Sequence, residues 1–136
     1  MNNPRVSILI ANYNNEIFIS ECINSLRKQT YKNIEIIFFD DFSKDHSIDK
    51  IKDFKEVKII QNIERTEIGS FNQMKAFEEG FKLSTGEIIL LLDSDDYLHR
   101  TKVEEIVGFF NNNKNAKIVF DYPIVIKNKK IINIKK

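Results

Sequence analysis

The sequence has few of the features that would place a protein outside the cytoplasm or in a membrane. It contains one cysteine, Cys22, so no disulfide can form within the chain. No apolar run approaches the roughly 18 residues needed to cross a bilayer, and the amino terminus lacks the basic-then-apolar pattern of a signal peptide. We therefore expect a cytoplasmic, reducing location, in which Cys22 is a buried packing residue.

An excess of charge of one sign is also lacking. The 136 residues include 21 Lys and Arg against 20 Asp and Glu, which gives a net charge of +1. Binding to a nucleic-acid backbone usually needs a strong local excess of basic residues. The balance therefore argues against nucleic acid as a partner and favours a small anion, bound by a chain with the length of one domain.

Apolar runs alternate with amphipathic stretches along most of the chain, a pattern typical of an α/β fold. The apolar runs predict strands at residues 5–11, 34–39, 57–60, 87–92 and 118–122. Apolar residues at helical spacing predict helices at residues 18–26, 48–54, 71–83 and 103–110. Together they predict a doubly wound, mostly parallel sheet with helices on both faces, and the strongly apolar strand at 87–92 is expected to be central.

The carboxyl-terminal segment, residues 124–136, alternates apolar residues with lysines around Asn128 and Lys129. It fits either a β-hairpin or a frayed end. The lysines from Lys127 to Lys136 fit contact with an anionic membrane surface or, the alternative that we favour, protection of an exposed edge strand from pairing with another chain. Peripheral membrane association stays open at this point.

Polar residues follow three of the predicted strands at the point where each strand ends. The clusters are Asn12-Tyr13-Asn14, Asp40-Asp41 and Asp93-Ser94-Asp95-Asp96. In open parallel sheets, ligands bind outside the carboxyl ends of the strands. The sequence therefore predicts a ligand site at this edge of the sheet.

Asp93 and Asp95 are candidates for a metal site. One residue separates them, so both side chains can face a common point if the backbone leaves the strand extended. Crowded carboxylates repel, and a raised pKa on one of them or a bound hard cation relieves the repulsion. Oxygen ligands favour Mg²⁺ or Mn²⁺, and a cation held by one or two carboxylates commonly binds a diphosphate. We interpret Asp96 more simply, as a solvated residue that caps the next helix.

Asp40-Asp41 and Tyr13 have two interpretations each. The aspartates fit a helix-capping turn, a role that Ser43 and Asp45 can also fill, or a carboxylate that accepts a hydrogen bond from a nucleobase N–H. Tyr13 fits core packing, which is the commoner case, or stacking on a base. Position alone favours neither interpretation of the aspartates.

Four segments, in order and spacing, show a more specific pattern. They are Val6 to Asn14, Ser25 to Tyr31, Phe39-Asp40-Asp41-Phe42-Ser43, and Gly86-Glu87 through Asp96. This pattern covers nearly the first hundred residues and resembles glycosyltransferase family 2. The resemblance implies a GT-A fold and transfer of a sugar, with inversion, from a nucleotide-diphosphate donor to an acceptor that is a glycan or is linked to a lipid.

The resemblance also implies roles for individual residues. Ala11, Asn12 and Tyr13 would line the base and ribose pocket, and Asp41 would hydrogen-bond the base, most often the uracil of a UDP-sugar. Asp93 would approach the ribose or the metal shell, and Asp95 would coordinate Mn²⁺ or Mg²⁺ that bridges the diphosphate. Such a cation stabilises negative charge on the leaving group.

Two residue positions depart from the family pattern in the donor site. Phe42 stands where glycine is common, which predicts an altered turn. Phe77-Glu78 stands where many members have Arg-Asn, which removes a helix-borne phosphate contact. Lys75 and Arg65 have the charge to substitute, but we expect both to be solvated surface residues.

A third departure concerns the general base that an inverting transfer needs. The family supplies it from a segment beyond the Asp-x-Asp strand, and this chain shows no counterpart. His46 and His99, the only histidines, are expected to be solvated or capping residues. We therefore expect residues 1–136 to form a single donor-binding domain, truncated before the acceptor-binding and catalytic-base segment and with little or no transferase activity alone.

Three other functions fit parts of the pattern. A signalling receiver needs an acidic pair after the first strand, where this chain has Ala11-Asn12-Tyr13. A nucleotidyltransferase needs a Gly-rich, basic loop at the same place, and none is present. A catalytically inactive nucleotide-binding or assembly module stays open, because the unassigned general base is the feature that would distinguish it from an enzyme.

Overall fold

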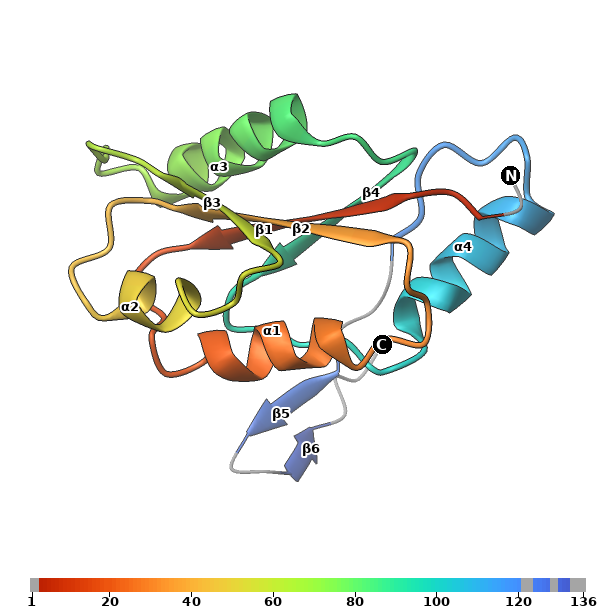
Figure 1. The fold of residues 1–136 in the computed structure, drawn as a ribbon, viewed down its shortest axis with the longest axis horizontal. Coiled ribbons are helices and arrows are strands. Elements are labelled where there is room, and N and C mark those ends of the chain that lie inside the picture. The colour runs from red at the N-terminus through yellow and green to blue at the C-terminus, as the bar shows by residue number, and fades with distance from the viewer. Residues whose placement is uncertain (1–2, 121–123, 128–129, 133–136) are drawn as a thin grey trace.

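The computed structural model describes residues 3–120, 124–127 and 130–132. In chain order its elements are β1 (Val6–Asn12), α1 (Ile19–Arg27), β2 (Ile34–Asp40), α2 (Ser47–Ile51), β3 (Val57–Gln61), α3 (Gly69–Leu83), β4 (Ile88–Asp93), α4 (Lys102–Asn112), β5 (Val125–Lys127) and β6 (Lys130–Ile132). Figure 1 shows a layered α/β arrangement, as the sequence predicted.

The first four strands form one parallel sheet in the order β3-β2-β1-β4. Val6 at the start of β1 lies opposite Ile34 of β2 and Ile88 of β4, so the three strands run in step. Their carboxyl ends consequently meet at one edge, where Ala11 pairs with Asp93 and Asn12 with Asp40. The register alone brings together the ends of three segments that are far apart in sequence.

The predicted central position of the strand at 87–92 is wrong for the sheet that the structure describes. β4 is an edge strand, and β1 and β2 occupy the interior. Ile88, Leu90 and Leu92 of β4 are buried, whereas the intervening Leu91 is 56% exposed. The apolar run therefore reflects burial of one face of β4. Apolar residues alone do not distinguish an edge strand from a central strand.

The main core lies between the sheet and three helices. α1, α2 and α4 cover one face of the sheet, and α3 covers the other (Figure 1). Cys22 of α1 is buried in this core as predicted, and burial, with smaller effects of the Asp96 and Asp95 charges, raises the pKa of its thiol to about 12. The thiol stays protonated and acts as a packing group.

α3 packs on the sheet through small and polar residues. The apolar residues that predict this helix include Met74 and Phe81, which are 72% and 61% exposed. The buried positions are Asn72, Ala76 and Gly80, four residues apart. A Cβ on Gly80 would lie 3.4 Å from the Leu9 side chain, so the small residues allow α3 to approach β1 closely.

The amino ends of the strands are tied together by a buried carboxylate, Glu35 of β2. It accepts hydrogen bonds from Ser7 Oγ at 2.6 Å and from the Thr85 N–H at 2.6 Å, and Lys58 Nζ lies at 3.1 Å. Burial opposes ionisation, but these hydrogen bonds outweigh it and lower the pKa of Glu35 from 4.5 to about 2. This carboxylate is held charged as part of the fold.

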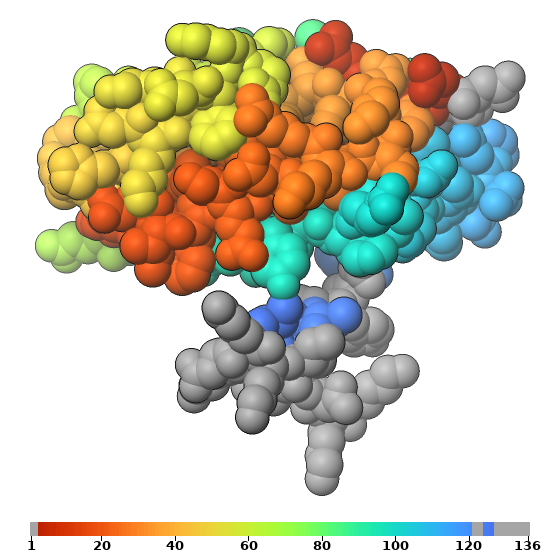
Figure 2. Space-filling view, turned by 60° about the horizontal axis from the view of Figure 1, so that its bottom comes forward, coloured from red at the N-terminus to blue at the C-terminus, as the bar shows by residue number. Residues whose placement is uncertain are grey.

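The carboxyl-terminal region differs from one prediction and agrees with another. The predicted strand at 118–122 is wrong for residues 118–120, which have no regular secondary structure; the rest of it lies outside the described residues. β5 and β6 form an antiparallel hairpin, one of the two possibilities for the tail. Figures 1 and 2 show it apart from the four-stranded sheet, with Ile126 exposed. In the ranges that the structure describes, no helix is long and apolar enough to span a membrane.

Candidate functional site

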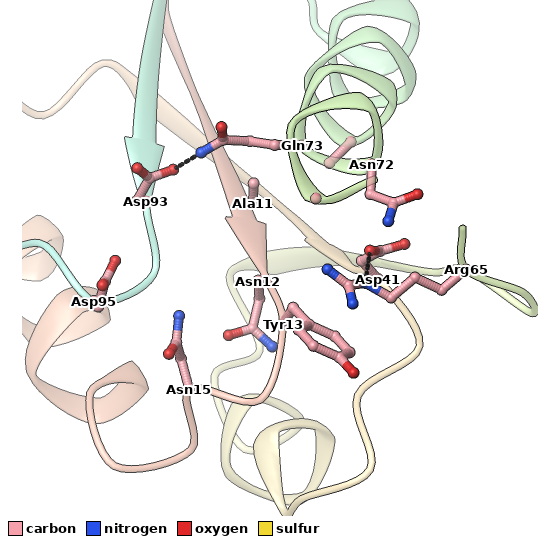
Figure 3. A pocket seen from close by; sticks show the side chains of 12 residues that line it. Ala11, Asn12, Tyr13, Asn15, Asp41, Arg65, Asn72, Gln73, Asp93 and Asp95 are labelled. Carbon is pink, nitrogen blue, oxygen red and sulfur yellow. Dashed lines mark hydrogen bonds and ion pairs between the residues drawn. The ribbon is translucent and has the colours of Figure 1, made fainter. Parts of the chain in front are cut away.

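A cavity of about 310 Å³ opens at the carboxyl ends of β1, β2 and β4 (Figure 3). The structure brings all six predicted site residues to its wall: Ala11, Asn12, Tyr13, Asp41, Asp93 and Asp95. Six further residues line the cavity without having been predicted as site residues: Asn15, Arg65, Gly69, Asn72, Gln73 and Ala76. The cavity thus has contributions from three strand ends, from the loops that hold Asn15 and Arg65, and from α3.

Asn12 ends β1 with its side-chain amide fixed in one orientation. Its Nδ2 donates to Asp40 Oδ1 at 2.8 Å and to Ser43 Oγ at 3.1 Å. Ser43 Oγ itself donates to Asp40 at 2.6 Å, so it can only accept from Asn12. Asn12 Oδ1 is left buried without a hydrogen-bond partner, although its residue lines the cavity. A buried acceptor in this position suits a hydroxyl, amide or water donor that arrives with a ligand.

The two neighbouring aspartates after β2 have separate tasks. Asp40 holds the turn, because its Oδ2 accepts a hydrogen bond from the Ser43 N–H at 3.0 Å. Asp41 lines the cavity, where it accepts hydrogen bonds from Asn62 Nδ2 at 2.9 Å and Arg65 Nε at 2.6 Å. Asp40 therefore makes the turn, which was one of the two interpretations of the sequence, and Asp41 faces the cavity.

Arg65 was expected to be a solvated surface charge, and this is wrong. Its side chain is only 25% exposed, forms an ion pair with Asp41 and places its guanidinium carbon 3.4 Å from the centroid of the Tyr13 ring. Tyr13 is 38% exposed, so it is not a core residue. A guanidinium stacks favourably on an aromatic face. At this end of the cavity, a cation therefore lies where a flat ring would stack on Tyr13 (Figure 3).

Phe42 stands where the family pattern commonly has glycine, and its backbone lies in a region that favours glycine. Its φ is 61°, in the left-handed region that a bulky residue rarely adopts. Lys44 Nζ lies 3.1 Å from the centroid of the Phe42 ring, and Ser43 is fixed on Asp40 as described. The turn therefore holds local backbone strain at Phe42.

Asp93 and Asp95 form the opposite wall from Arg65. Asp93 ends β4, is half-buried and accepts a hydrogen bond from Gln73 Nε2 at 2.6 Å. The backbone N–H of Ser94, between them, donates to the Ala11 carbonyl at 3.1 Å and so fastens this turn to β1. Asp96 does not line the cavity; burial, followed by the charges of Asp95 and Asp93, raises its pKa. The expected crowding of carboxylates is thus present at this end.

The wall formed by Asp93 and Asp95 suits a cation whose remaining coordination positions are filled by a bound ligand. In the described part of the chain, no three His, Cys, Asp or Glu side chains converge as a ready-made metal cage. Two carboxylates line the cavity wall here, and Mg²⁺ or Mn²⁺ is commonly held by one or two carboxylates together with phosphate oxygens. The donor set therefore fits a cation shared with a bound diphosphate.

The residues that α3 contributes carry a signal in the sequence. Gly69, Asn72, Gln73 and Ala76 are spaced as i, i+3, i+4 and i+7, which puts them on one helical face. Helices were predicted from the spacing of apolar residues, whereas the residues of α3 that line the cavity are polar or small. Their spacing was therefore not recognised as a signal. His46 and His99 are both exposed and outside the cavity wall, as expected.

Comparison with known proteins shows the family. The family model described as glycosyl transferase family 2 matches residues 7–134. A UDP-Glc:alpha-D-GlcNAc-diphosphoundecaprenol beta-1,3-glucosyltransferase of Escherichia coli is 38% identical over 86% of this chain and 44% of its own length. An uncharacterized glycosyltransferase of Nostoc sp. is 33% identical over 95% of this chain and 40% of its own. The chain spans about two fifths of the length of these curated relatives.

Solved structures share the fold. TarS of Staphylococcus aureus, residues 1–349, superposes with a TM-score of 0.70 at 24% identity, and the match covers 86% of this chain and 38% of that 1–349 chain. A mannosyltransferase of Pyrobaculum calidifontis, solved in complex with GDP-Man and Mn²⁺, gives 0.70 at 21% identity over 79% of this chain and 32% of its own. The sheet, the order of the strand-end motifs and the match over residues 7–134 lead to one conclusion: the chain belongs to glycosyl transferase family 2.

Proposed function

We propose that this domain binds the nucleotide-diphosphate sugar of an inverting glycosyl transfer, with UDP as the nucleotide. The observation that carries the proposal is the single cavity whose wall joins Tyr13 and Asp41 at one end to Asp93 and Asp95 at the other. A nucleoside diphosphate needs both ends, since its base calls for stacking and a hydrogen-bond acceptor, and its phosphates call for a cation.

At the base end, Asp41 and Tyr13 are the residues that would recognise the nucleotide. A carboxylate accepts a hydrogen bond from the N3–H of uracil, whereas N3 of cytosine is itself an acceptor. The proposal therefore predicts that UDP binds more tightly than CDP. A base that stacks on Tyr13 needs the space that the Arg65 guanidinium occupies, 3.4 Å from the ring centroid, so Arg65 must move when the base enters.

At the phosphate end, Asp95 and Asp93 would hold Mn²⁺ or Mg²⁺. A divalent cation there supplies electrostatic stabilisation of the diphosphate leaving group. Asp95 would bind the cation directly, and Asp93 would contact the ribose or the shell around the cation. Asn12 Oδ1, buried and without a partner, is available to accept a hydrogen bond from a ligand hydroxyl or bound water.

The proposal for the acceptor and the location comes from relatives. The E. coli relative is named for a diphosphoundecaprenol-linked acceptor, and another relative is a poly(ribitol-phosphate) beta-glucosyltransferase of Bacillus spizizenii. TarS has been solved with UDP-GlcNAc and with UDP. By analogy, we infer a glycan or lipid-linked acceptor and a place at the cytoplasmic face of the membrane.

The residues of the cavity favour donor binding without transfer by this chain alone. Among the described residues, the carboxylates that line the wall are those of Asp41, Asp93 and Asp95, all of which belong to the proposed donor site, and no histidine lines it. An inverting transfer needs a further group to take the acceptor proton. The domain would therefore supply the donor and metal site and leave the general base to another segment.

Calorimetric titration of UDP tests the proposal, first with Mn²⁺ and then with EDTA. We expect Mn²⁺-dependent binding that Asp95→Ala weakens by about 100-fold, because a ligand of the cation is lost, with an unchanged melting temperature. Asp53→Ala, at an exposed aspartate outside the cavity, is the matched control and should bind like the wild type. Equal binding of UDP in EDTA, or to the Asp95 variant, would refute the metal-bridged site.

CDP and GDP, titrated in parallel, test the base end. Tighter binding of UDP than of CDP is expected from Asp41. Failure of UDP, CDP and GDP to bind with Mn²⁺ would count against the nucleotide site as a whole.

A further inference from the structure

α3 contributes a polar contact to the acidic wall from a position that the family pattern does not highlight. Phe77 and Glu78 occupy the places where many members have Arg-Asn. Phe77 has no hydrogen-bond donor in its side chain, and Glu78 is exposed and paired with Lys82 at 3.0 Å. Gln73, one helical turn before Phe77 on the same face, lines the cavity and donates from Nε2 to Asp93 Oδ1 at 2.6 Å.

A small side chain, that of Ala11, lies beside the contact between Gln73 and Asp93. Figure 3 shows Gln73 reaching from α3 past Ala11 to Asp93 at the end of β4. Ala76, the next residue on this face of α3, also lines the cavity and is buried. A larger side chain at Ala11 would crowd the space beside the amide.

An amide is the donor type that suits a carboxylate which must keep its charge. Lysine or arginine at position 73 would pair with Asp93 and compete with a cation or a ligand hydroxyl for it. The glutamine amide is neutral, so it restricts the rotation of the carboxylate while leaving the negative charge in place. One oxygen, Oδ1, is engaged by Gln73, and the other is left for a ligand.

We propose that Gln73 positions Asp93 for the donor, holding Oδ1 so that Oδ2 meets the ribose or the shell of the cation. This inference rests on the proposed function of the cavity. Gln73 acts through Asp93 and is a positioning residue. The contact lies at the surface, where one hydrogen bond contributes little to folding, so its loss should appear in ligand binding and leave the fold intact.

The test is calorimetric binding of UDP with Mn²⁺ to Gln73→Ala, with Met74→Ala as the matched control. Met74 is the next residue on α3, is 72% exposed and does not line the cavity. We expect Gln73→Ala to weaken UDP binding about fivefold, as for one lost hydrogen bond, and to leave the melting temperature unchanged. Met74→Ala should match the wild type in both measurements.

A double-mutant cycle separates positioning from a direct contact. Asp93→Ala should retain weak UDP binding through Asp95 and the base end, and adding Gln73→Ala to it should then have no further effect. A second fivefold loss in that background would overturn the positioning role, because Gln73 would then act without Asp93.

The two proposals fail in different ways. Wild-type protein that binds UDP with Mn²⁺ while Gln73→Ala binds it equally well would overturn the role of Gln73 alone. Wild-type protein that binds no nucleotide would overturn the proposed function, and the role of Gln73 with it. A lower melting temperature together with weaker binding in Gln73→Ala would assign the residue to the fold instead.

Discussion

At the amino end of the sheet, Glu35 is 3% exposed in its side chain and is surrounded by donors from Ser7, Thr85 and Lys58. At the carboxyl end, Asp93 is half-buried with one partner from Gln73, and Asp95 is exposed. Both regions place carboxylates beside the same strands. Glu35 is enclosed by donors from neighbouring strands and ties them together, whereas Asp93 keeps one oxygen that a ligand can reach.

The largest expected effect at the amino end comes from Gly86→Ala. A Cβ there would lie 2.5 Å from Ser7 Oγ, 2.7 Å from Ser7 N and 2.8 Å from the Arg5 carbonyl, so strand backbone would have to shift. We expect a loss of about 3 kcal/mol in the free energy of unfolding, measured by urea denaturation.

Gly108→Ala is the matched control for that change. Gly108 lies inside α4, and a Cβ there would meet nothing within 4 Å. Alanine should stabilise the protein by about 0.5–1 kcal/mol, because it loses less chain entropy in a helix. A similar loss of stability in both variants would show that the close contacts at Gly86 are not the cause of its effect.

The pH dependence of the free energy of unfolding tests the role of Glu35 at the amino end of the sheet. Its pKa is lowered from 4.5 in the unfolded chain to about 2 in the folded protein. A lowered pKa contributes stability that is fully present above pH 4.5 and is lost as the pH falls towards 2. The contribution is about 3 kcal/mol at neutral pH.

Glu35→Gln isolates that contribution. The variant should be less stable at pH 6 and should lose less stability between pH 4.5 and 2 than the wild type, as measured by urea denaturation at each pH. Parallel curves for the two proteins across this range would show that Glu35 is not the titrating group.

Arg65→Met tests whether Asp41 at the carboxyl end depends on a removable partner. Asp41 is 6% exposed in its side chain, and the substitution leaves it with Asn62 as the remaining side-chain donor. We expect a loss of about 2 kcal/mol in the free energy of unfolding, and a larger rise in melting temperature on adding UDP than in the wild type, because the base N–H then replaces the lost donor.

Arg27→Met is the matched control, since Arg27 forms an ion pair with Glu56 in which both side chains are well exposed. A surface pair of this kind should change stability very little. An equal loss in the two variants would mean that the position of Arg65 in the cavity has no special effect.

The smallest expected effect concerns the strained turn. Phe42→Gly should raise the free energy of unfolding by about 0.5 kcal/mol. The strain energy relieved in the folded protein should slightly exceed the cost of the extra chain entropy that glycine gives the unfolded state. Thermal unfolding checks it. A clear loss of stability would show that the contact of Phe42 with Lys44 outweighs the strain.

The sequence predicted most of the framework because local patterns report burial and strand ends directly. The apolar runs before Asn12, Asp40 and Asp93 identified three strands, and their parallel direction followed from the alternation with helices. Patterns of this kind do not report neighbours in space. The central position assigned to residues 87–92 was therefore wrong, and so was the strand at 118–120.

The site shows the same division between local pattern and spatial arrangement. Asp93 and Asp95 were predicted to form a site because they follow a buried strand, whereas Asp41 and Tyr13 were singled out only by the resemblance to the family. Arg65 gave no such signal, since a lone arginine in a loop looks like any surface charge. Its ion pair with Asp41 and its stacking on Tyr13 depend on where the loop before α3 meets β2.

Residue types at strand ends were enough to predict the parallel α/β framework, the family and the acidic and aromatic ends of the cavity. The hydrogen-bond partners of its carboxylates follow only from the tertiary structure. It joined Glu35 to Ser7 and Thr85, and Gln73 to Asp93, across 20 or more residues of chain. Hydrogen bonds between such distant residues depend on strand register and helix packing, which no local pattern specifies.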